Sequence, residues 1–352
     1  MKAKSSVRLW SASSESPCAL PNELRWKAVS KAQAILTRLG ESMEPVALLF
    51  DHNASLIVAL LAVLKAGKAY VVLDQTHPPA RLAAQLEEIH IRLLVTDQSY
   101  VVKAEQILPT PGGIVTMETV GECAKAAHNH GIHLPGDQPA ALYITSGSTG
   151  APKAVARKQS TILHRIWYET KEDQLNAQDH IGLIFACSYA ASSHDLFSAL
   201  LSGACLCLYD IRRQGIVGLA DWLRQSEISR LHIAAPLFRQ FLNSLQPSDF
   251  FPAMRYMTPA SQQIYKSDLT RYWQHFPTTS LLVSRFASSE TGIICRLLVT
   301  PETEISGNVV PVGYPFPGKE AFILATNWGP TKLARLQCAV AIWLQAIGEN
   351  HS

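Results

Sequence analysis

The feature that most limits the possible folds is an alternation of short apolar runs with amphipathic segments of helical length. In the first third of the chain, strands are predicted at 46–50, 69–73 and 92–96, with helices at 55–65 and 79–89. The strand segments are nearly continuous in Val, Leu, Ile and Ala, which indicates burial on both faces. Buried strands joined by helices are typical of a parallel sheet covered by helices. The sequence therefore predicts an α/β fold with layered β-sheets and helices.

The same alternation returns in the second half of the chain. The further strands are predicted at 181–185, 204–209, 230–234 and 280–286, and the further helices at 160–171, 194–201, 216–225 and 236–245. Residues 1–21 are rich in Ser and lack periodicity, so we expect them to be poorly ordered. No internal repeat is recognisable.

Composition narrows the classes of partner. The chain has 352 residues, 47% of them hydrophobic, and a formal net charge of +3 without any basic stripe, which argues against nucleic acid. The longest apolar stretch, 56–64, is too short to span a membrane, and no apolar run follows the basic residues near the N-terminus. The cysteines mostly lie in apolar surroundings typical of reduced thiols. We therefore expect a cytoplasmic protein that acts on small molecules.

Residues 143–154 form the strongest local motif, an apolar strand that opens into a loop of Gly, Ser and Thr with one lysine. Gly147 and Gly150 allow backbone angles that let successive N–H groups converge on an anion. The hydroxyl groups of neighbouring Ser and Thr residues add donors, and Lys153 adds a positive charge. The spacing differs from the common phosphate loop of NTPases, so a different nucleotide-binding fold is indicated.

This motif resembles the signature loop of the adenylate-forming (AMP-binding) superfamily, most closely that of nonribosomal peptide synthetase adenylation domains. Four further segments resemble family segments in the same order: 61–74, 188–204, 284–292 and 309–318. The resemblance covers about residues 22–324. It implies the large N-terminal core of an adenylate-forming enzyme, with ATP and Mg²⁺ as cofactors.

The resemblance also implies roles for individual residues. Lys153 and Glu290 are the implied catalytic residues, and Glu290 is the implied Mg²⁺ ligand, since a carboxylate is a hard oxygen donor. Phe286 is implied to pack on adenine and Ser289 to contact the α-phosphate. The remaining nucleotide contacts are implied at Thr145, Ser146, Gly147, Ser148, Thr149 and Gly150. The implied substrate pocket includes Tyr189, Ala190 and Ser261.

Several positions depart from the family pattern. Ala190 stands where peptide synthetase domains usually place the aspartate that pairs with an α-ammonium group, so an uncharged acyl chain is expected to fit better than an α-amino acid. Asp195, later in the same helix, is interpreted as structural. Ala260, Ser261 and Gln262 replace a common Gly-Gly-Glu, which costs backbone freedom, and Ala154 replaces a usual glycine.

The C-terminal lid domain of the family, with its catalytic lysine, is not recognisable in the chain. Residues 325–352 are instead predicted to form a divergent tail with an amphipathic helix at 333–347. This helix either covers apolar surface that the lid domain would have hidden or is the degenerate end of a truncated gene. We favour the truncated gene and expect low turnover, because the lid lysine is not recognisable.

The predicted function is ATP-dependent activation of a carboxylic acid as acyl-AMP, with release of pyrophosphate. The acyl group would then pass to a phosphopantetheine thiol of a carrier protein or to CoA. Two alternatives stay open: an amino acid substrate, and a catalytically incomplete nucleotide-binding remnant or interaction module.

Two other clusters carry less weight. His128, His130 and His133 have spacing that could ligate a metal ion, but a solvated loop is the favoured interpretation. Cys205 and Cys207 alternate within a predicted strand, where buried packing is the better account.

Overall fold

The computed structural model describes residues 8–11, 21–40, 42–118, 132, 134–146 and 152–321. The chain divides into two compact units, the first ending at His232 and the second beginning at Ile233. This division falls inside the region 22–324 that the sequence treats as one core. The predicted helix at 333–347 lies outside the described residues.

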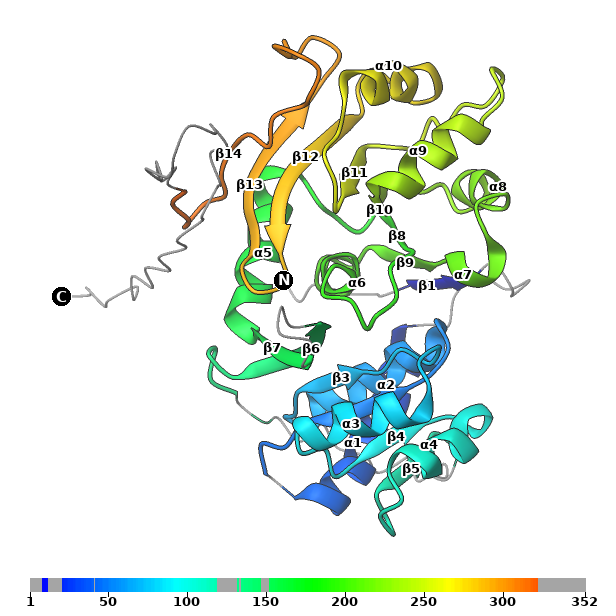
Figure 1. The fold of residues 1–352 in the computed structure, drawn as a ribbon, viewed down its shortest axis with the longest axis vertical. Coiled ribbons are helices and arrows are strands. Elements are labelled where there is room, and N and C mark those ends of the chain that lie inside the picture. The colour runs from blue at the N-terminus through cyan, green and yellow to red at the C-terminus, as the bar shows by residue number, and fades with distance from the viewer. Residues whose placement is uncertain are drawn as a thin grey trace, which may run out of the picture. The chain divides into compact units, whose positions relative to one another are not determined.

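The first unit contains a six-stranded sheet with the order β5-β4-β2-β3-β6-β7 (Figure 1). The strands are β2 (Val46–Leu49), β3 (Tyr70–Val72), β4 (Leu94–Thr96), β5 (Ile114–Thr116), β6 (Pro139–Ser146) and β7 (Pro152–Lys158). All neighbours pair in parallel except β6 and β7, which are antiparallel. The predicted parallel sheet is thus confirmed, with an antiparallel strand at one edge that the sequence did not indicate.

Helices cover both faces of this sheet. They are α1 (Pro21–Leu39), α2 (Ala54–Lys65), α3 (Pro79–Glu88) and α4 (Val101–Ile107). Val46 and Leu48 of β2 belong to a core cluster shared with α1 and α2, whereas Ala47 and Leu49 belong to a second cluster shared with α3 and α4. Successive residues of one strand therefore enter opposite cores, as burial on both faces requires.

Glycine ends helix α2 as the sequence indicates. Gly67 has φ +72°, a left-handed conformation that glycine adopts without steric cost, and its N–H donates to the carbonyl of Leu64. The chain then turns directly into β3.

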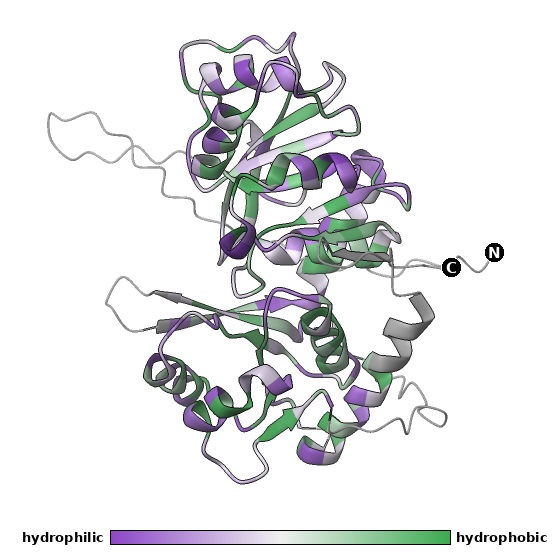
Figure 2. Cartoon of the chain, turned by 90° about the vertical axis from the view of Figure 1, so that its right-hand side faces the viewer, coloured by the Kyte–Doolittle hydropathy of each residue, from purple (hydrophilic) through white to green (hydrophobic). Residues whose placement is uncertain are grey.

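A second group of strands has the order β1-β9-β8-β10, all in parallel, and belongs to the first unit except for the last two residues of β10. The strands are β1 (Arg8–Ser11), β8 (His180–Leu183), β9 (Cys205–Leu208) and β10 (Arg230–Ala234), and the helices are α5 (Gln159–Glu172), α6 (Ser192–Ser202), α7 (Ile211–Gln214) and α8 (Leu219–Gln225). Figure 2 shows the hydrophobic colour along much of the sheets, with white and purple stretches on several strands, and polar stretches on many helices. Apolar side chains of α6, β8 and β9 belong to the same core cluster as α1 and α2.

Strand β1 corrects part of the prediction for residues 1–21. Arg8–Ser11 pair in register with Cys205–Leu208 and are not irregular. The remaining residues of this segment before Pro21 lie outside the described ranges.

The second unit contains β11 (Tyr256–Ala260), β12 (Leu281–Ser288), β13 (Gly292–Val299) and β14 (Tyr314–Pro315), in that order, with α9 (Ala235–Ser244) and α10 (Lys266–His275). The pair β11–β12 is parallel, and the pairs β12–β13 and β13–β14 are antiparallel. Its core is aromatic: the rings of Tyr272 and Phe276 stack at 4.4 Å and those of Phe251 and Phe276 at 5.0 Å. Such offset aromatic pairs add about 0.5–1.5 kcal/mol each beyond the area that they bury.

No helix in the described part of the chain is both long enough and apolar enough to cross a membrane. Cys187, Cys205, Cys207 and Cys295 are buried and occur as thiols, as the sequence predicts.

Candidate functional site

The predicted phosphate loop joins two strands of a hairpin. β6 and β7 pair antiparallel, with Thr145 opposite Lys153 and Ser146 opposite Pro152. The Thr145 hydroxyl donates to the Lys153 carbonyl at 3.3 Å. Gly147, Ser148, Thr149 and Gly150 lie outside the described residues. The structure therefore places the predicted loop between two paired strands, and its contacts with a ligand stay a prediction.

The sequence suggested that Lys153 lies in the loop. In the structure it lies at the start of β7 instead. Its side chain is exposed. Among the described residues, its ammonium group has no hydrogen-bond or ion-pair partner. A strand holds the lysine backbone more firmly than a loop would, while the ammonium stays available for an anion.

The second predicted segment lies at the tip of the β12–β13 hairpin. Phe286 pairs with Cys295 just before a bulge, and its side chain is 36% exposed. Ser289 and Glu290 follow in the turn. A bulge increases the local twist of a hairpin and redirects side chains, so it contributes to the direction in which the tip projects.

Hydrogen bonds brace this turn. The Ser288 hydroxyl accepts from the backbone N–H of Thr291 at 3.1 Å, and the two side-chain hydroxyls lie 2.9 Å apart. The Lys319 ammonium donates to the carbonyls of Thr291 and Ile293. Glu290 itself is exposed and makes no hydrogen bond or ion pair within the described ranges. The turn is held by its neighbours, and the Glu290 carboxylate stays free to bind a ligand.

The predicted acyl-pocket residues lie just before α6. Tyr189 is 54% exposed, and Ala190 is partly buried against the main core cluster. The hydroxyl of Ser192 donates to the Tyr189 carbonyl at 2.7 Å, and that of Ser193 to the Ala190 carbonyl at 2.8 Å. These bonds fix the backbone at the start of the helix.

Ser261, the third predicted pocket residue, has φ +73° and an exposed side chain. A side chain in this left-handed conformation costs roughly 1–2 kcal/mol relative to the right-handed one. The interpretation that this position has lost the freedom of a glycine is therefore consistent with the backbone.

The predicted site residues are divided between the two units. Thr145, Lys153, Tyr189 and Ala190 belong to the first, whereas Ser261, Phe286, Ser289 and Glu290 belong to the second. Each unit thus carries four of these predicted site residues.

A small pocket in the first unit was not predicted from the sequence. Its lining includes Phe50, His52, Cys187, Ser188 and Arg212. Burial lowers the pKa of His52, so its imidazole is neutral at pH 7, and its Nε2–H donates to the Leu183 carbonyl at 2.9 Å. Burial likewise raises the pKa of Cys187 to about 12, which keeps it a thiol. The neutral His52 imidazole therefore carries no positive charge to bind an anion, and the Cys187 thiol is not the thiolate that acts as a nucleophile.

Arg212, which lines this pocket, forms an ion pair with Asp74. Arg212 donates to both carboxylate oxygens of Asp74, at 2.7 and 2.8 Å, and Asp74 also accepts from the backbone and hydroxyl of Thr76. Burial raises the pKa of Asp74, but the hydrogen bonds from Arg212 and Thr76 outweigh it and hold the pKa well below its usual range. No local signal marks this pair, because the partners lie 138 residues apart.

The donor set fits ATP and Mg²⁺. An exposed lysine beside a loop of Gly, Ser and Thr suits a phosphate group. An exposed carboxylate without a protein partner suits a hard cation that keeps several water ligands. The other metal candidates that the sequence offered, His128, His130 and His133, lie outside the described residues.

Comparison with known proteins decides the family. The model of the AMP-binding enzyme family matches residues 23–331. The chain belongs to this family. The predicted fold class, the N-terminal core of an adenylate-forming enzyme, is thereby confirmed.

Relatives and solved structures agree with this assignment. The chain is 29% identical over 307 residues to surfactin synthase subunit 2 of Bacillus subtilis (strain 168), covering 86% of this chain and 8% of that protein. It is 26% identical to tyrocidine synthase 1 of Brevibacillus parabrevis, over 86% of this chain and 27% of the relative. The chain therefore spans a small part of the curated relatives that it matches.

Among solved structures, the nonribosomal peptide synthetase FmoA3 superimposes with a TM-score of 0.79 at 17% identity, covering 90% of this chain and 33% of that one. The N-terminal subdomain of Klebsiella oxytoca NpsA, in complex with 3-hydroxybenzoyl-AMSN, gives a TM-score of 0.77 at 20% identity, over 94% and 81% of the two chains. At these identities the likeness establishes the fold.

Proposed function

We propose that this chain activates a carboxylic acid with ATP, giving an acyl-adenylate and pyrophosphate. The observation that carries the proposal is the family match over residues 23–331, together with an exposed Lys153 and an exposed Glu290 on two hairpins. A form of the structural neighbour FmoA3 is bound to AMPPNP, which supports ATP as the nucleotide.

In the proposed reaction, a carboxylate oxygen attacks the α-phosphorus, and the bond from that phosphorus to the pyrophosphate oxygen breaks. Lys153 would bind phosphate oxygens and offset their charge. Glu290 would hold Mg²⁺, which supplies neutralisation of the charge on the departing pyrophosphate. Phe286 would pack on the adenine and Ser289 would donate to the α-phosphate. The loop 147–150 would supply further backbone donors.

For the substrate, we propose an acid without an α-ammonium group. Ala190 brings no charge to the pocket, and the nearby Asp195 carboxylate is already engaged: one oxygen lies 2.7 Å from His194 Nδ1 and the other 3.4 Å from His232 Nδ1. Burying an ammonium without a partner costs several kcal/mol. Exchange activity that is higher with α-amino acids than with their deaminated counterparts would contradict this choice.

The acceptor of the acyl group would be a phosphopantetheine thiol of a carrier protein or CoA. The synthetases among the relatives support an acyl-transfer context. We also propose a cytoplasmic location, supported by the buried thiols and by the need for ATP.

The test is ATP–pyrophosphate exchange with a panel of carboxylic acids. It should be run on this chain alone and on this chain fused to a C-terminal lid from a related enzyme, which supplies the lid lysine of the family. Acid-dependent exchange by the fusion supports the proposal. Nucleotide binding without exchange for any acid, even in the fusion, would instead indicate a nucleotide-binding remnant.

Lys153→Ala should weaken binding of a fluorescent ATP analogue by about tenfold or more, since a charge-assisted hydrogen bond is lost. Lys158→Ala is the matched control, because Lys158 is also exposed on β7. Equal affinity of the two variants would remove Lys153 from the site.

Glu290→Gln keeps the shape of the side chain and removes its charge. The Mg²⁺ dependence of nucleotide binding should fall in this variant and stay unchanged in Glu302→Gln, a control at another exposed glutamate of the second unit. If the Mg²⁺ dependence of Glu290→Gln matches that of the parent, the metal ligand lies elsewhere.

A further inference from the structure

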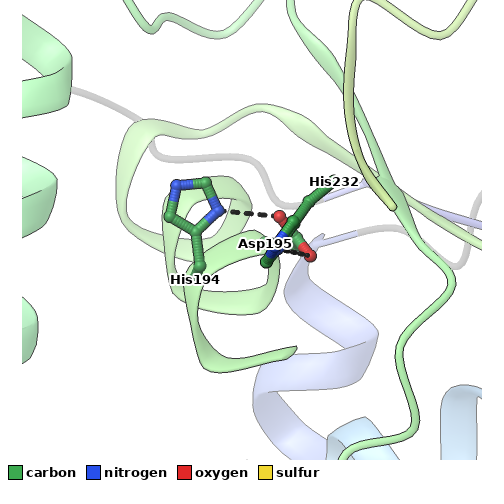
Figure 3. A group of neighbouring side chains, drawn as sticks. All are labelled: His194, Asp195 and His232. Atoms are coloured by element: carbon green, nitrogen blue, oxygen red, sulfur yellow. Dashed lines mark hydrogen bonds and ion pairs between the residues drawn. The ribbon is translucent and has the colours of Figure 1, made fainter. Parts of the chain in front are cut away.

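A cluster of two histidines and two carboxylates lies in the first unit, apart from the residues assigned to the nucleotide. His194 and Asp195 lie on α6, His232 on β10 and Glu169 on α5. Figure 3 shows the His194 ring directed toward the Asp195 carboxylate, with dashed lines joining Asp195 to both His194 and His232. The proposed function leaves this cluster unexplained.

The hydrogen-bond geometry of His194 demands a positive charge. Its Nε2 lies 2.6 Å from a Glu169 oxygen and its Nδ1 lies 2.7 Å from an Asp195 oxygen. A neutral imidazole has one N–H, so it can donate to only one of these carboxylates and turns a lone pair toward the other. Either a second proton or a metal ion beside Nδ1 removes this repulsion.

Glu169 is held so that it orients His194. Its second oxygen accepts from the Ser198 hydroxyl at 2.8 Å, and Arg165 donates to the oxygen that faces His194 at 3.1 Å. These contacts fix a carboxylate that receives the Nε2–H of His194 and leave Nδ1 as the ligand atom. A carboxylate behind a ligating histidine is the common arrangement in protein metal sites.

The ligand atoms are spaced for one ion. His194 Nδ1 and His232 Nδ1 lie 2.7 and 3.4 Å from the two oxygens of Asp195, and one donor atom from each of the three residues falls within 4.8 Å of the others. Ligands bound tetrahedrally at about 2.1 Å lie about 3.4 Å apart, so small side-chain rotations suffice. We propose that His194, Asp195 and His232 bind a divalent transition metal ion, zinc by their donor chemistry, with Glu169 orienting His194.

The three proposed ligands are buried enough for a structural ion, and the partial exposure of His194 gives the ion access to the site. The side chains of Asp195 and His232 are 2% and 1% exposed, and that of His194 is 17% exposed. The ion would connect α6 to β10, and through Glu169 to α5. Bound water could complete the coordination. The role is independent of ATP and of Glu290.

The first experiment uses the whole chain, stripped of metal with a chelator and titrated with Co²⁺ and then Zn²⁺. We expect one ion per chain, a dissociation constant of about 1 μM or tighter, and a cobalt spectrum of nitrogen and oxygen donors. Absence of saturable binding, or a thiolate-to-cobalt band, overturns the proposal.

Variants then locate the site. His194→Gln and His232→Gln should each weaken the ion by at least about a hundredfold, since a ligand is lost, and Glu169→Gln by about tenfold, since only the orienting carboxylate is changed. A triple variant of the competing loop, His128→Gln with His130→Gln and His133→Gln, should bind as the parent does. If His232→Gln fails to fold, His194→Gln alone tests the site, because the His194 side chain is partly exposed and its replacement should disturb the core less. Parent-like binding by His194→Gln, or loss of binding in the triple variant, overturns the proposal.

Discussion

The ion pair between Asp74 and Arg212 should contribute more to stability than any neighbouring surface pair, and its contribution should depend on pH. Arg212→Met removes the guanidinium and keeps an apolar stem of similar length. The Asp74 side chain is 7% exposed and would lose two charge-assisted hydrogen bonds while keeping those from Thr76. The variant therefore leaves a nearly buried carboxylate only partly satisfied.

The magnitude follows from the two hydrogen bonds and their exposure. Charge-assisted bonds contribute about 1.5–3 kcal/mol each when buried. The Arg212 side chain is 39% exposed, so hydration and screening reduce this contribution, and we expect a loss of about 2 kcal/mol. Arg213→Met is the matched control: Arg213 makes a single hydrogen bond to Asp51 and its side chain is 63% exposed, so its loss should be clearly smaller than that of Arg212→Met.

The pH dependence has a definite sign. Because the folded-state pKa of Asp74 is lowered, the stabilisation is fully present above the unfolded-state pKa of about 3.9 and is lost as pH falls through the folded-state pKa. Below pH 4 the difference between parent and Arg212→Met should shrink, by at most about 1.4 kcal/mol per pH unit.

Urea unfolding followed by circular dichroism at pH 7 and pH 3 measures both effects. A loss for Arg212→Met no greater than that for Arg213→Met would refute the assigned strength. A difference from the parent that stays constant between the two pH values would refute the assigned cause.

Much of the sheet could be predicted because the signal is local. The segments 46–50 and 69–73 are apolar throughout, 92–96 is apolar between Arg92 and Thr96, and each contains an observed strand, because burial on two faces demands apolar residues at successive positions. Strand β7 was missed for the opposite reason. Its residues, Pro152–Lys158, include charged side chains, and only antiparallel pairing with β6 makes them a strand.

For the site as well, motifs of consecutive residues could be predicted, whereas contacts between distant segments could not. The Gly, Ser and Thr loop and the segment around Glu290 could be recognised because their chemistry lies within a dozen consecutive residues. The contact between Asp195 and His232 joins a helix to a strand, and neither neighbourhood indicates the other. Asp195 was expected to be structural, and its partners His194 and His232 could be identified only from the fold. Polar pairs between distant segments leave no periodic trace, so sequence patterns do not reveal them.

Two further substitutions test the backbone and packing. Gly182→Ala in β8 should destabilise the first unit by about 1–3 kcal/mol, because the new Cβ would lie 2.8 Å from atoms of both Leu231 and Trp222. Thermal unfolding measures this loss, and no loss would show that these two side chains move aside. Ser261→Gly should raise stability by about 0.5–1 kcal/mol, since glycine removes the cost of φ +73° but adds freedom to the unfolded chain. The Ser261 side chain is exposed and makes no hydrogen bond within the described residues, so its loss has little cost of its own. Ala260→Gly is the control: Ala260 ends β11 and has no positive φ, so glycine there should destabilise the second unit. Equal losses for both glycine variants in urea unfolding would show that the left-handed backbone at Ser261 carries no strain.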